Sequence, residues 1–388
     1  MRIVIVGAGI GGLTLGVALR QRGHEVRILE RRAEFRDEGA GVVLGPNVLA
    51  AVRLLGLDSA IEAEGRVVPA MNIADQRGRV LTRGTYRVTQ LLTPGIAIHR
   101  SRLHQLLRER FDGELVLAAE PSDLSFGEHP SLRVPGRTLD CDLIVGADGI
   151  RSQVRKELEP NFETRYSGTT CFRFVVDEQW TDEVFEQWGP GKRVGVVPLG
   201  HGQTYVFLTL NRPPRAPRQF GSLAQFRALW SEFTGPASRA LLALEELEGV
   251  LHNDLEDGLA ARFWAPGVVL LGDAAHAVTP NMGQGAGLAI EDACCLANLV
   301  PDGSAGTRAA LDDALAEYER FRRPRADWIL RQSYTLGKIA QLESAPLRWL
   351  RDWAVRLTPA SVNDRALRRI IGEMPGVPID RQLTTART

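Results

Sequence analysis

Two glycine-rich segments hold the residues of this sequence best suited to bind a phosphate-bearing molecule. The first, GAGIGG at 7–12, follows a run of Ile and Val and matches the pattern G-x-G-x-x-G. The second, GDAAHAVTPNMGQGAGLAIEDA at 272–293, places an acid after an apolar run and several glycines before a helical stretch. Glycine lets the backbone approach a phosphate closely, and a helix N-terminus supplies free N–H groups and positive potential. Each segment is therefore a candidate anion-binding helix start.

The glycines of the first motif have separate predicted tasks. Gly7 permits the tight turn, Gly9 lets the backbone approach a pyrophosphate, and Gly12 allows the helix to pack closely on the strand. Glu30 follows at the end of the next apolar run, near the spacing expected for the acid that binds ribose hydroxyls. The alternative for Glu30 is a solvated acid at a strand end. The motif predicts a dinucleotide site but does not distinguish NAD from FAD.

The elements that would position these residues follow from hydrophobic periodicity. The N-terminal Ile and Val run and CDLIVGADG at 141–149 are typical of parallel strands buried on both faces. Alternating Val, Phe and Thr from 168 to about 210 predict antiparallel strands. We expect an α/β, Rossmann-like FAD-binding domain with an inserted β-rich substrate domain and C-terminal helices. Helices are predicted at 46–56, 101–111, 222–232, 236–247 and 308–334.

Composition excludes several other classes of function. Lys plus Arg equal Asp plus Glu at 47 each, so no overall field attracts nucleic acid. The four cysteines show no metal-ligand spacing, and we expect no metal and free thiols in a cytoplasmic setting. No apolar run is long enough to span a bilayer, and the N-terminus does not read as a signal peptide.

Further segments give the sequence a family resemblance that covers nearly the whole chain. They are GAGVVLGPN at 39–47, HRSRLHQLL at 99–107, GADGIRSQVR at 146–155 and the GD segment at 272–287. In order and spacing they resemble FAD-dependent aromatic monooxygenases of the para-hydroxybenzoate hydroxylase fold. Within them the chain looks most like the short branch of 3-hydroxybenzoate 6-hydroxylase, 6-hydroxynicotinate 3-monooxygenase and flavin-dependent urate hydroxylase.

The resemblance implies a cofactor, a reaction and a set of cofactor contacts. The cofactor would be FAD, with NADPH or NADH as reductant. Dioxygen would form a C4a-hydroperoxyflavin that hydroxylates a small phenolic or heteroaromatic substrate. Val43 and Leu124 would contact the flavin and adenine, Arg100 would clamp the cofactor, and Asp273 would contact the ribityl or ribose region. The implied cofactor contacts, together with those of the first motif, are Gly7, Gly9, Gly11, Gly12, Glu30, Arg31, Val43, Arg100, Leu124, Asp148, Asp273, Gly283, Gln284, Gly285, Ala286 and Gly287.

Some of these residues have plainer interpretations. Asp148 and Asp273 could cap the loops that follow strands, as short acids often do. His276 belongs to the DAAH turn, and we expect it to be a hydrogen-bonded scaffold residue rather than a base. A flavin-binding protein without catalysis, and a flavin oxidase or dehydrogenase without oxygen transfer, remain alternative functions.

Candidate substrate contacts come from the inserted sheet and the turn before Gly283. Arg193 and Tyr205 fit positions that face the substrate in the urate branch, and an arginine there could hold an anion. A solvated hairpin charge is the alternative for Arg193. Asn281 stands where that branch usually has an acid, which puts urate in doubt and removes an obvious carboxylate base. Arg173 matches a recurrent family arginine whose role the sequence leaves unassigned. The predicted catalytic set is thus Arg193, Tyr205 and Asn281.

The C-terminal segment combines arginines with Trp328, Trp349 and Trp353. We expect its helices to pack through this aromatic stripe, leaving the arginines in solvent, and not to bind a membrane. A monomer or homodimer is expected. The predicted division of the chain is 1–75, 97–167 and 262–334 for FAD binding, 76–96 and 168–261 for the substrate domain, and 335–388 for a helical tail.

Overall fold

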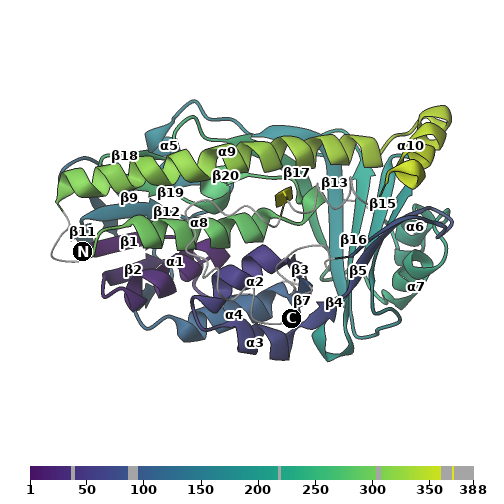
Figure 1. Ribbon diagram of the computed structural model, residues 1–388, viewed down its shortest axis with the longest axis horizontal. Helices are drawn as coiled ribbons and strands as arrows, with labels where there is room; N and C mark the ends of the chain where they lie inside the picture. The colour runs from purple at the N-terminus through teal and green to yellow at the C-terminus, as the bar shows by residue number, and fades with distance from the viewer. Residues whose placement is uncertain (36–39, 86–94, 217–219, 303–306, 360–368, 371–388) are drawn as a thin grey trace.

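The computed structural model describes residues 1–35, 40–85, 95–216, 220–302, 307–359 and 369–370. The described chain forms two regions side by side, each built around a large sheet, with one long helix running along both (Figure 1). None of the described helices is long and apolar enough to cross a bilayer.

A six-stranded sheet carries the first glycine motif. It is parallel except for the pair 264–265 and 268–270 at one edge, and a central strand is the N-terminal Ile and Val run, buried on both faces. In spatial order its strands are β18 (Trp264–Ala265), β19 (Val268–Leu270), β12 (Leu143–Gly146), β1 (Arg2–Val6), β2 (Glu25–Leu29) and β8 (Glu114–Val116).

Helices cover this sheet and join its pieces. Helix α1 follows the first motif and packs against α8, which follows the second motif; α8 in turn packs against α9. The helices of this region are α1 (Ile10–Gln21), α2 (Pro46–Arg53), α3 (Asp58–Glu64), α4 (Arg100–Arg110), α5 (Gln153–Leu158), α8 (Gly285–Leu299) and α9 (Arg308–Ala340). Two small three-stranded sheets flank it, β11 (Arg137–Asp140)–β10 (Ser131–Val134)–β9 (Ser122–Ser125) and β3 (Gly41–Leu44)–β7 (Gly95–His99)–β4 (Arg66–Val68).

An eight-stranded sheet, antiparallel except where β14 meets β5, forms the second region, as the Val, Phe and Thr alternation predicts. Its order is β20 (His276–Ala277), β17 (Leu251–Leu259), β13 (Arg165–Val176), β16 (Thr204–Asn211), β15 (Lys192–Pro198), β14 (Val184–Gly189), β5 (Ala70–Asp75) and β6 (Val80–Thr85). One face packs on α6 (Leu223–Ala228) and α7 (Pro236–Ala243). The division of the chain into domains at the boundaries given above stays a prediction.

Short 3-10 turns and a final helix complete the described chain. The turns are η2 (Gly200–Gly202), η3 (Gly272–Ala274) and η4 (Pro280–Met282), and the last two lie within the second glycine segment. The final helix, α10 (Ala345–Leu357), lies at one end of the molecule, beyond the end of α9 (Figure 1). Its Arg351 is buried, whereas its Trp349 and Trp353 are 64% and 45% exposed. The expectation that the C-terminal stripe packs against the protein is therefore wrong for this helix.

Candidate active site

A groove of about 1030 Å³ opens where the parallel strands β1 and β2 end. The first glycine motif forms one wall, because Gly7 takes a positive φ of 108° that turns the chain from strand into helix. Nothing lies within 4 Å of a Cβ built on Gly9, so this position leaves open space toward the groove. Of the predicted cofactor contacts, those lining the groove are Gly7, Gly9, Glu30, Arg31, Arg100, Asp148 and Asp273.

Glu30 lies at the edge of this groove and is fixed by the backbone. Its carboxylate accepts hydrogen bonds from Ala8 N at 3.1 Å and from Arg32 N at 3.0 Å. The contact with Ala8 ties the acid to the glycine turn itself. A ribose beside this turn would therefore meet an acceptor held in place, which a freely solvated strand-end acid would not provide.

The second glycine segment reaches the same site from the other side. A cavity of about 430 Å³ adjoins the groove, and both Gly9 and Gly11 of the first segment line it together with Gly283, Gly285 and Ala286 of the second. Neither α1 nor α8 has a side-chain cap at its N-terminus. Two uncapped helix starts thus face one space, and their N–H groups and dipoles are available to an anionic ligand.

The two predicted acids differ in what they do. Asp148 supports the start of α5, whose N-cap residue is Ser152, because its carboxylate accepts hydrogen bonds from Ser152 Oγ at 2.5 Å and from Gln153 N at 2.7 Å. The capping interpretation therefore describes Asp148, although its residue also lines the groove. Asp273 instead points into the open space shared by the groove and the cavity. The surrounding protein atoms exclude water from its carboxyl and so raise the pKa of this group, while the nearby His276 and Arg100 oppose that rise.

Beneath Asp273, a buried network holds the η3 turn in place. His276 is 1% exposed, and its Nε2 lies 2.5 Å from Asp292 Oδ2. The same oxygen accepts a hydrogen bond from Gly272 N at 3.1 Å, at the first residue of the turn. His276 lines neither the groove nor the cavity, and its hydrogen bond is to a buried carboxylate, as expected of a scaffold residue.

Several predicted cofactor contacts do not line the shared space. A Cβ on Gly12 would collide with the carbonyl oxygen of Gly7, so this glycine serves close packing, as expected. Leu124 packs against the core of the FAD region, and Gly287 faces Val48 of α2. Gln284 is buried at the N-cap of α8. Leu124, Gln284 and Gly287 line neither the groove nor the cavity, and the cofactor contacts expected of them stay predictions.

The inserted sheet supplies the far wall of the cavity through strict alternation. In β13, β15 and β16 the even-numbered residues, such as Phe172, Val194 and Val206, belong to the core under α6 and α7. Odd-numbered neighbours point to the opposite face because side chains alternate along a strand. The residues of the sheet that line the cavity are Cys171, Arg173, Glu186, Arg193, Val197, Tyr205, Phe207, Thr209 and Leu255.

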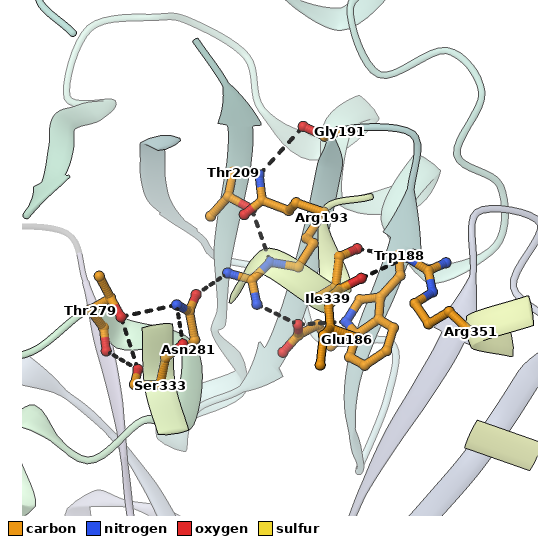
Figure 2. A network of polar contacts seen from close by, with 12 residues as sticks. Glu186, Trp188, Gly191, Arg193, Thr209, Thr279, Asn281, Ser333, Ile339 and Arg351 are labelled. Carbon is orange, nitrogen blue, oxygen red and sulfur yellow. Dashed lines mark hydrogen bonds and ion pairs between the residues drawn. The ribbon is translucent and has the colours of Figure 1, made fainter. Parts of the chain in front are cut away.

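Arg193 lies at the deep end of this cavity with its charge already paired (Figure 2). Its Nη1 donates to Glu186 Oε1 at 2.9 Å, its Nε donates to Thr209 Oγ1 at 3.2 Å, and its Nη2 donates to Asn281 Oδ1. The side chain is 1% exposed. Arg193 is therefore not a solvated hairpin charge: it lines the cavity, as expected of a residue that faces the substrate, and a carboxylate and two other polar oxygens surround its guanidinium.

Asn281 links this end of the cavity to the long helix. Its Nδ2 donates to Ser333 O on α9 at 2.8 Å and to Thr279 Oγ1 at 3.0 Å (Figure 2). With its Oδ1 bonded to Arg193, the amide of Asn281 is fixed in one orientation. The neutral side chain therefore acts as a bridge between sheet and helix, and no carboxylate stands at this position.

Glu186 is the carboxylate that the sequence did not reveal. It comes from β14, where its Oε1 also accepts a hydrogen bond from Trp188 Nε1 at 2.7 Å. Register pairs Trp188 with Arg193 and Glu186 with Gly195 across the β14–β15 hairpin. The sequence did contain a signal. Glu186 and Trp188 form an E-x-W pattern and therefore share one face of their strand, and Arg193 lies on the same face of the next strand of the hairpin.

Tyr205 and Arg173 lie nearer the groove. Burial raises the pKa of Tyr205, while the neighbouring Arg173 opposes the rise. Arg173 lines both the groove and the cavity, donates to Asn253 Oδ1, and has a buried Nε without a described hydrogen-bond partner. No carboxylate is paired with Arg173 among the described residues. The residues that line both spaces therefore include Arg173, whereas Arg193, which lines only the cavity, is paired with Glu186.

Comparisons with known proteins agree with this geometry. The family model described as "FAD binding domain" matches residues 1–333. An aurachin C monooxygenase/isomerase from Stigmatella aurantiaca is 37% identical over 95% of this chain and 97% of its own. A 2-heptyl-3-hydroxy-4(1H)-quinolone synthase from Pseudomonas aeruginosa is 34% identical over 96% of this chain and 99% of its own.

Solved structures share the fold. Klebsiella pneumoniae HpxO, in a complex with FAD and uric acid, superposes with a TM-score of 0.85 at 22% identity and covers 96% of each chain. Pseudomonas aeruginosa PqsL, in a complex with 2-aminobenzoylacetate, has a TM-score of 0.81 at 25% identity and covers 92% of this chain and all of its own. The arrangement of two sheets and one long helix is therefore that of known flavoproteins.

Proposed function

Since this chain belongs to the FAD binding domain family, we propose that it hydroxylates an uncharged, bicyclic heteroaromatic ring of the alkyl-4-quinolone class. The protein is a flavoprotein monooxygenase that uses FAD, with NAD(P)H as reductant. The two relatives named for aurachin C and for a heptyl-hydroxyquinolone support the choice of ring.

The residues around the shared space fit FAD. We propose that the uncapped start of α1 with Gly9 holds the pyrophosphate, that Glu30 binds the adenosine ribose, and that Asp273 accepts from the ribityl hydroxyls. The start of α8 at Gly285 would face the flavin ring. Bound FAD, reduced by NAD(P)H, would activate dioxygen, and the chain would orient the substrate and exclude water.

One observation carries the choice of an uncharged ring: Arg193 is closed off by Glu186 and Asn281. A carboxylated substrate at the deep end would meet Glu186 as well as the arginine, and it would gain no free cation. The remaining wall, from Val197, Phe207 and Leu255, is apolar and suits the body of a bicyclic ring. This arrangement favours a neutral substrate, oriented through hydrogen bonds by the Asn281 and Thr209 side chains.

Arg173 and Tyr205 are proposed to act on the reactive part of the ring. Loss of a ring N–H or enol proton to water makes the ring electron-rich, and the negative charge then lies mainly on an oxygen. Arg173 borders the side of the cavity nearest the proposed flavin site and pairs with no carboxylate among the described residues, so it would stabilise that oxygen anion. Tyr205, whose pKa is raised, remains a phenol that donates a hydrogen bond to it.

The test compares three aromatic classes on the purified flavoprotein. NAD(P)H oxidation should accelerate with 2-heptyl-4-quinolone and much less with 3-amino-4-hydroxybenzoate or urate, and mass spectrometry should show a product with one added oxygen atom. Acceleration by the carboxylated benzoate alone would overturn the proposal. Acceleration without an oxygenated product would indicate an oxidase. We further propose a cytoplasmic setting, supported by four buried cysteines without disulfides.

A further inference from the structure

Two aromatic side chains of β16, Tyr205 and Phe207, line the substrate cavity next to each other. Their ring centres lie 6.1 Å apart, and the ring planes are tilted by 42°. These two are the aromatic rings among the described residues of the cavity lining. The direction in which each ring points therefore decides how much of the cavity is left for the ring of a substrate.

The ring of Phe207 extends over the neighbouring strand β15, where the residue opposite it is a glycine. Register pairs Phe207 with Gly195, and a Cβ built on Gly195 would overlap the ring atoms Cε1 and Cζ of Phe207. The residues two positions away on the same face of β15, Arg193 and Val197, both carry side chains that line the cavity. Glycine inside a strand costs stability and often marks a close approach of another group. Here the approaching group is the phenyl ring.

The other positions around this ring are already filled. Tyr205 and Thr209 flank Phe207 along its own strand, and Arg173 of β13 lies opposite it on the other side. Tyr205 cannot move aside, because a Cβ on Gly41 of the FAD region would lie only 2.7 Å from the Tyr205 Cβ. A phenyl ring displaced from β15 therefore has one direction left, which is into the cavity.

The cavity is small enough for this displacement to matter. Its volume is about 430 Å³, and part of its lining faces the proposed flavin site. A phenyl ring turned into this space takes the room of one six-membered ring. A substrate with two fused rings needs that room, whereas a substrate with one ring does not, because protein interiors are closely packed and leave little space to spare.

We propose that Gly195 is a positioning residue that sets the size of the ring the site accepts. Because it carries no side chain, the Phe207 ring stays over β15 and the cavity admits a two-ring heteroaromatic compound. A side chain at position 195 restricts the site to single rings. The chemistry of the ring rests on the proposed function, but the selection by size applies to any uncharged ring in this cavity.

The test uses the FAD-loaded, full-length chain and two probes, 4-quinolone and 4-pyridone. These compounds share a ring N–H and an oxygen and differ by one fused benzene ring. The dissociation constant of each is measured from the change in flavin absorbance. Gly195→Ala should weaken binding of 4-quinolone about tenfold and binding of 4-pyridone about twofold or less, because the displaced phenyl ring overlaps the second ring alone.

A second substitution separates the effect of the ring from that of the added methyl group. In the Gly195→Ala, Phe207→Ala double variant, 4-quinolone should bind within about twofold of its affinity for Phe207→Ala alone. Gly84→Ala is the matched control in the same sheet, because the nearest atom to its new Cβ, Met71 O, lies 3.9 Å away. It should bind both probes as the wild type does.

Three outcomes overturn the proposal: equal loss of both probes in Gly195→Ala, a double variant as weak as Gly195→Ala, or an unmoved phenyl ring. The last is read without a ligand from the crystal structure of the FAD-loaded Gly195→Ala variant, where the Phe207 ring should point into the cavity. Failure of the proposed function looks different. If 4-quinolone binds with the expected dependence on Gly195 but 2-heptyl-4-quinolone yields no oxygenated product, the selection by size stands and the proposed substrate falls.

Discussion

Among the described residues, fully buried arginine–carboxylate pairs lie in two places, one beside a cavity and one away from it. Between α8 and α9, Arg322 pairs with Glu291 and Asp292, and all three side chains are fully buried. In the inserted sheet, Arg193 pairs with Glu186 almost as deeply, but both residues line the substrate cavity. The chemistry of the pairs is the same, and the space beside them differs.

The difference separates a structural role from a role in recognition. In the first cluster every charge is met by protein, since Arg325 also pairs with Glu291 at 2.6 Å, and the cluster holds the η3 turn under Asp273. In the second cluster Glu186 compensates the charge of Arg193, so the pairing determines which net charge a ligand in the cavity encounters. A buried pair is weak evidence for stability in itself, but removal of one partner leaves the other charge uncompensated.

The largest effect is expected from Arg322→Met. It leaves Glu291 and Asp292 buried with too few partners, and the free energy of unfolding should fall by about 3–5 kcal/mol in chemical denaturation. Flavin content should fall too, because Asp292 holds Gly272. Arg323→Met, which breaks only an exposed pair with Glu319 at 3.9 Å, is the control and should change stability by about 0.5 kcal/mol or less. If the two variants were equally stable, the buried Arg322 cluster would contribute no more to stability than the exposed pair.

A smaller effect, with a defined pH dependence, is expected from His276→Gln. Burial alone disfavours the imidazolium, but the adjacent Asp292 prevails and raises the pKa of His276 above its ordinary 6.5. The stabilisation by this pair is therefore complete below pH 6.5 and is lost as the pH rises through the raised pKa. Unfolding curves from pH 5 upward should show this loss in the wild type, a flatter profile in the variant, and a cost of about 1.5–3 kcal/mol at low pH. An unchanged profile would mean that His276 is neutral in the fold.

The smallest change in free energy, and the most informative for recognition, is expected from Glu186→Gln. It leaves the Arg193 charge uncompensated at the cavity wall, so inhibition by carboxylated phenols should improve about tenfold, while the KM for the quinolone rises by a similar factor. Glu183→Gln is the control. Glu183 lies directly before the same strand, β14, and pairs with Arg83 at the surface. If benzoates bind the two variants equally, Glu186 does not set the charge of the site.

Much of the fold could be predicted because it depends on local pattern. The glycine at 7 must take a positive φ, the apolar runs must be buried strands, and alternation in 168–210 must give a two-faced sheet. The convergence of two glycine segments on one space came from the family resemblance, and the cavity that both segments line agrees with it. The contact expected of Leu124 could not be derived from local pattern, because it depends on how a small sheet packs on the core.

By itself, the sequence determined the fold class, the two helix starts and the balance of charge, because these follow from residue type and spacing along one chain. Only the tertiary structure decided that Glu186 neutralises Arg193, and that Arg351 turns inward while Trp349 and Trp353 face solvent. The reason is physical: the free energy of a charge or an apolar side chain depends on what lies beside it. Those neighbours come from strands and helices far apart in the sequence.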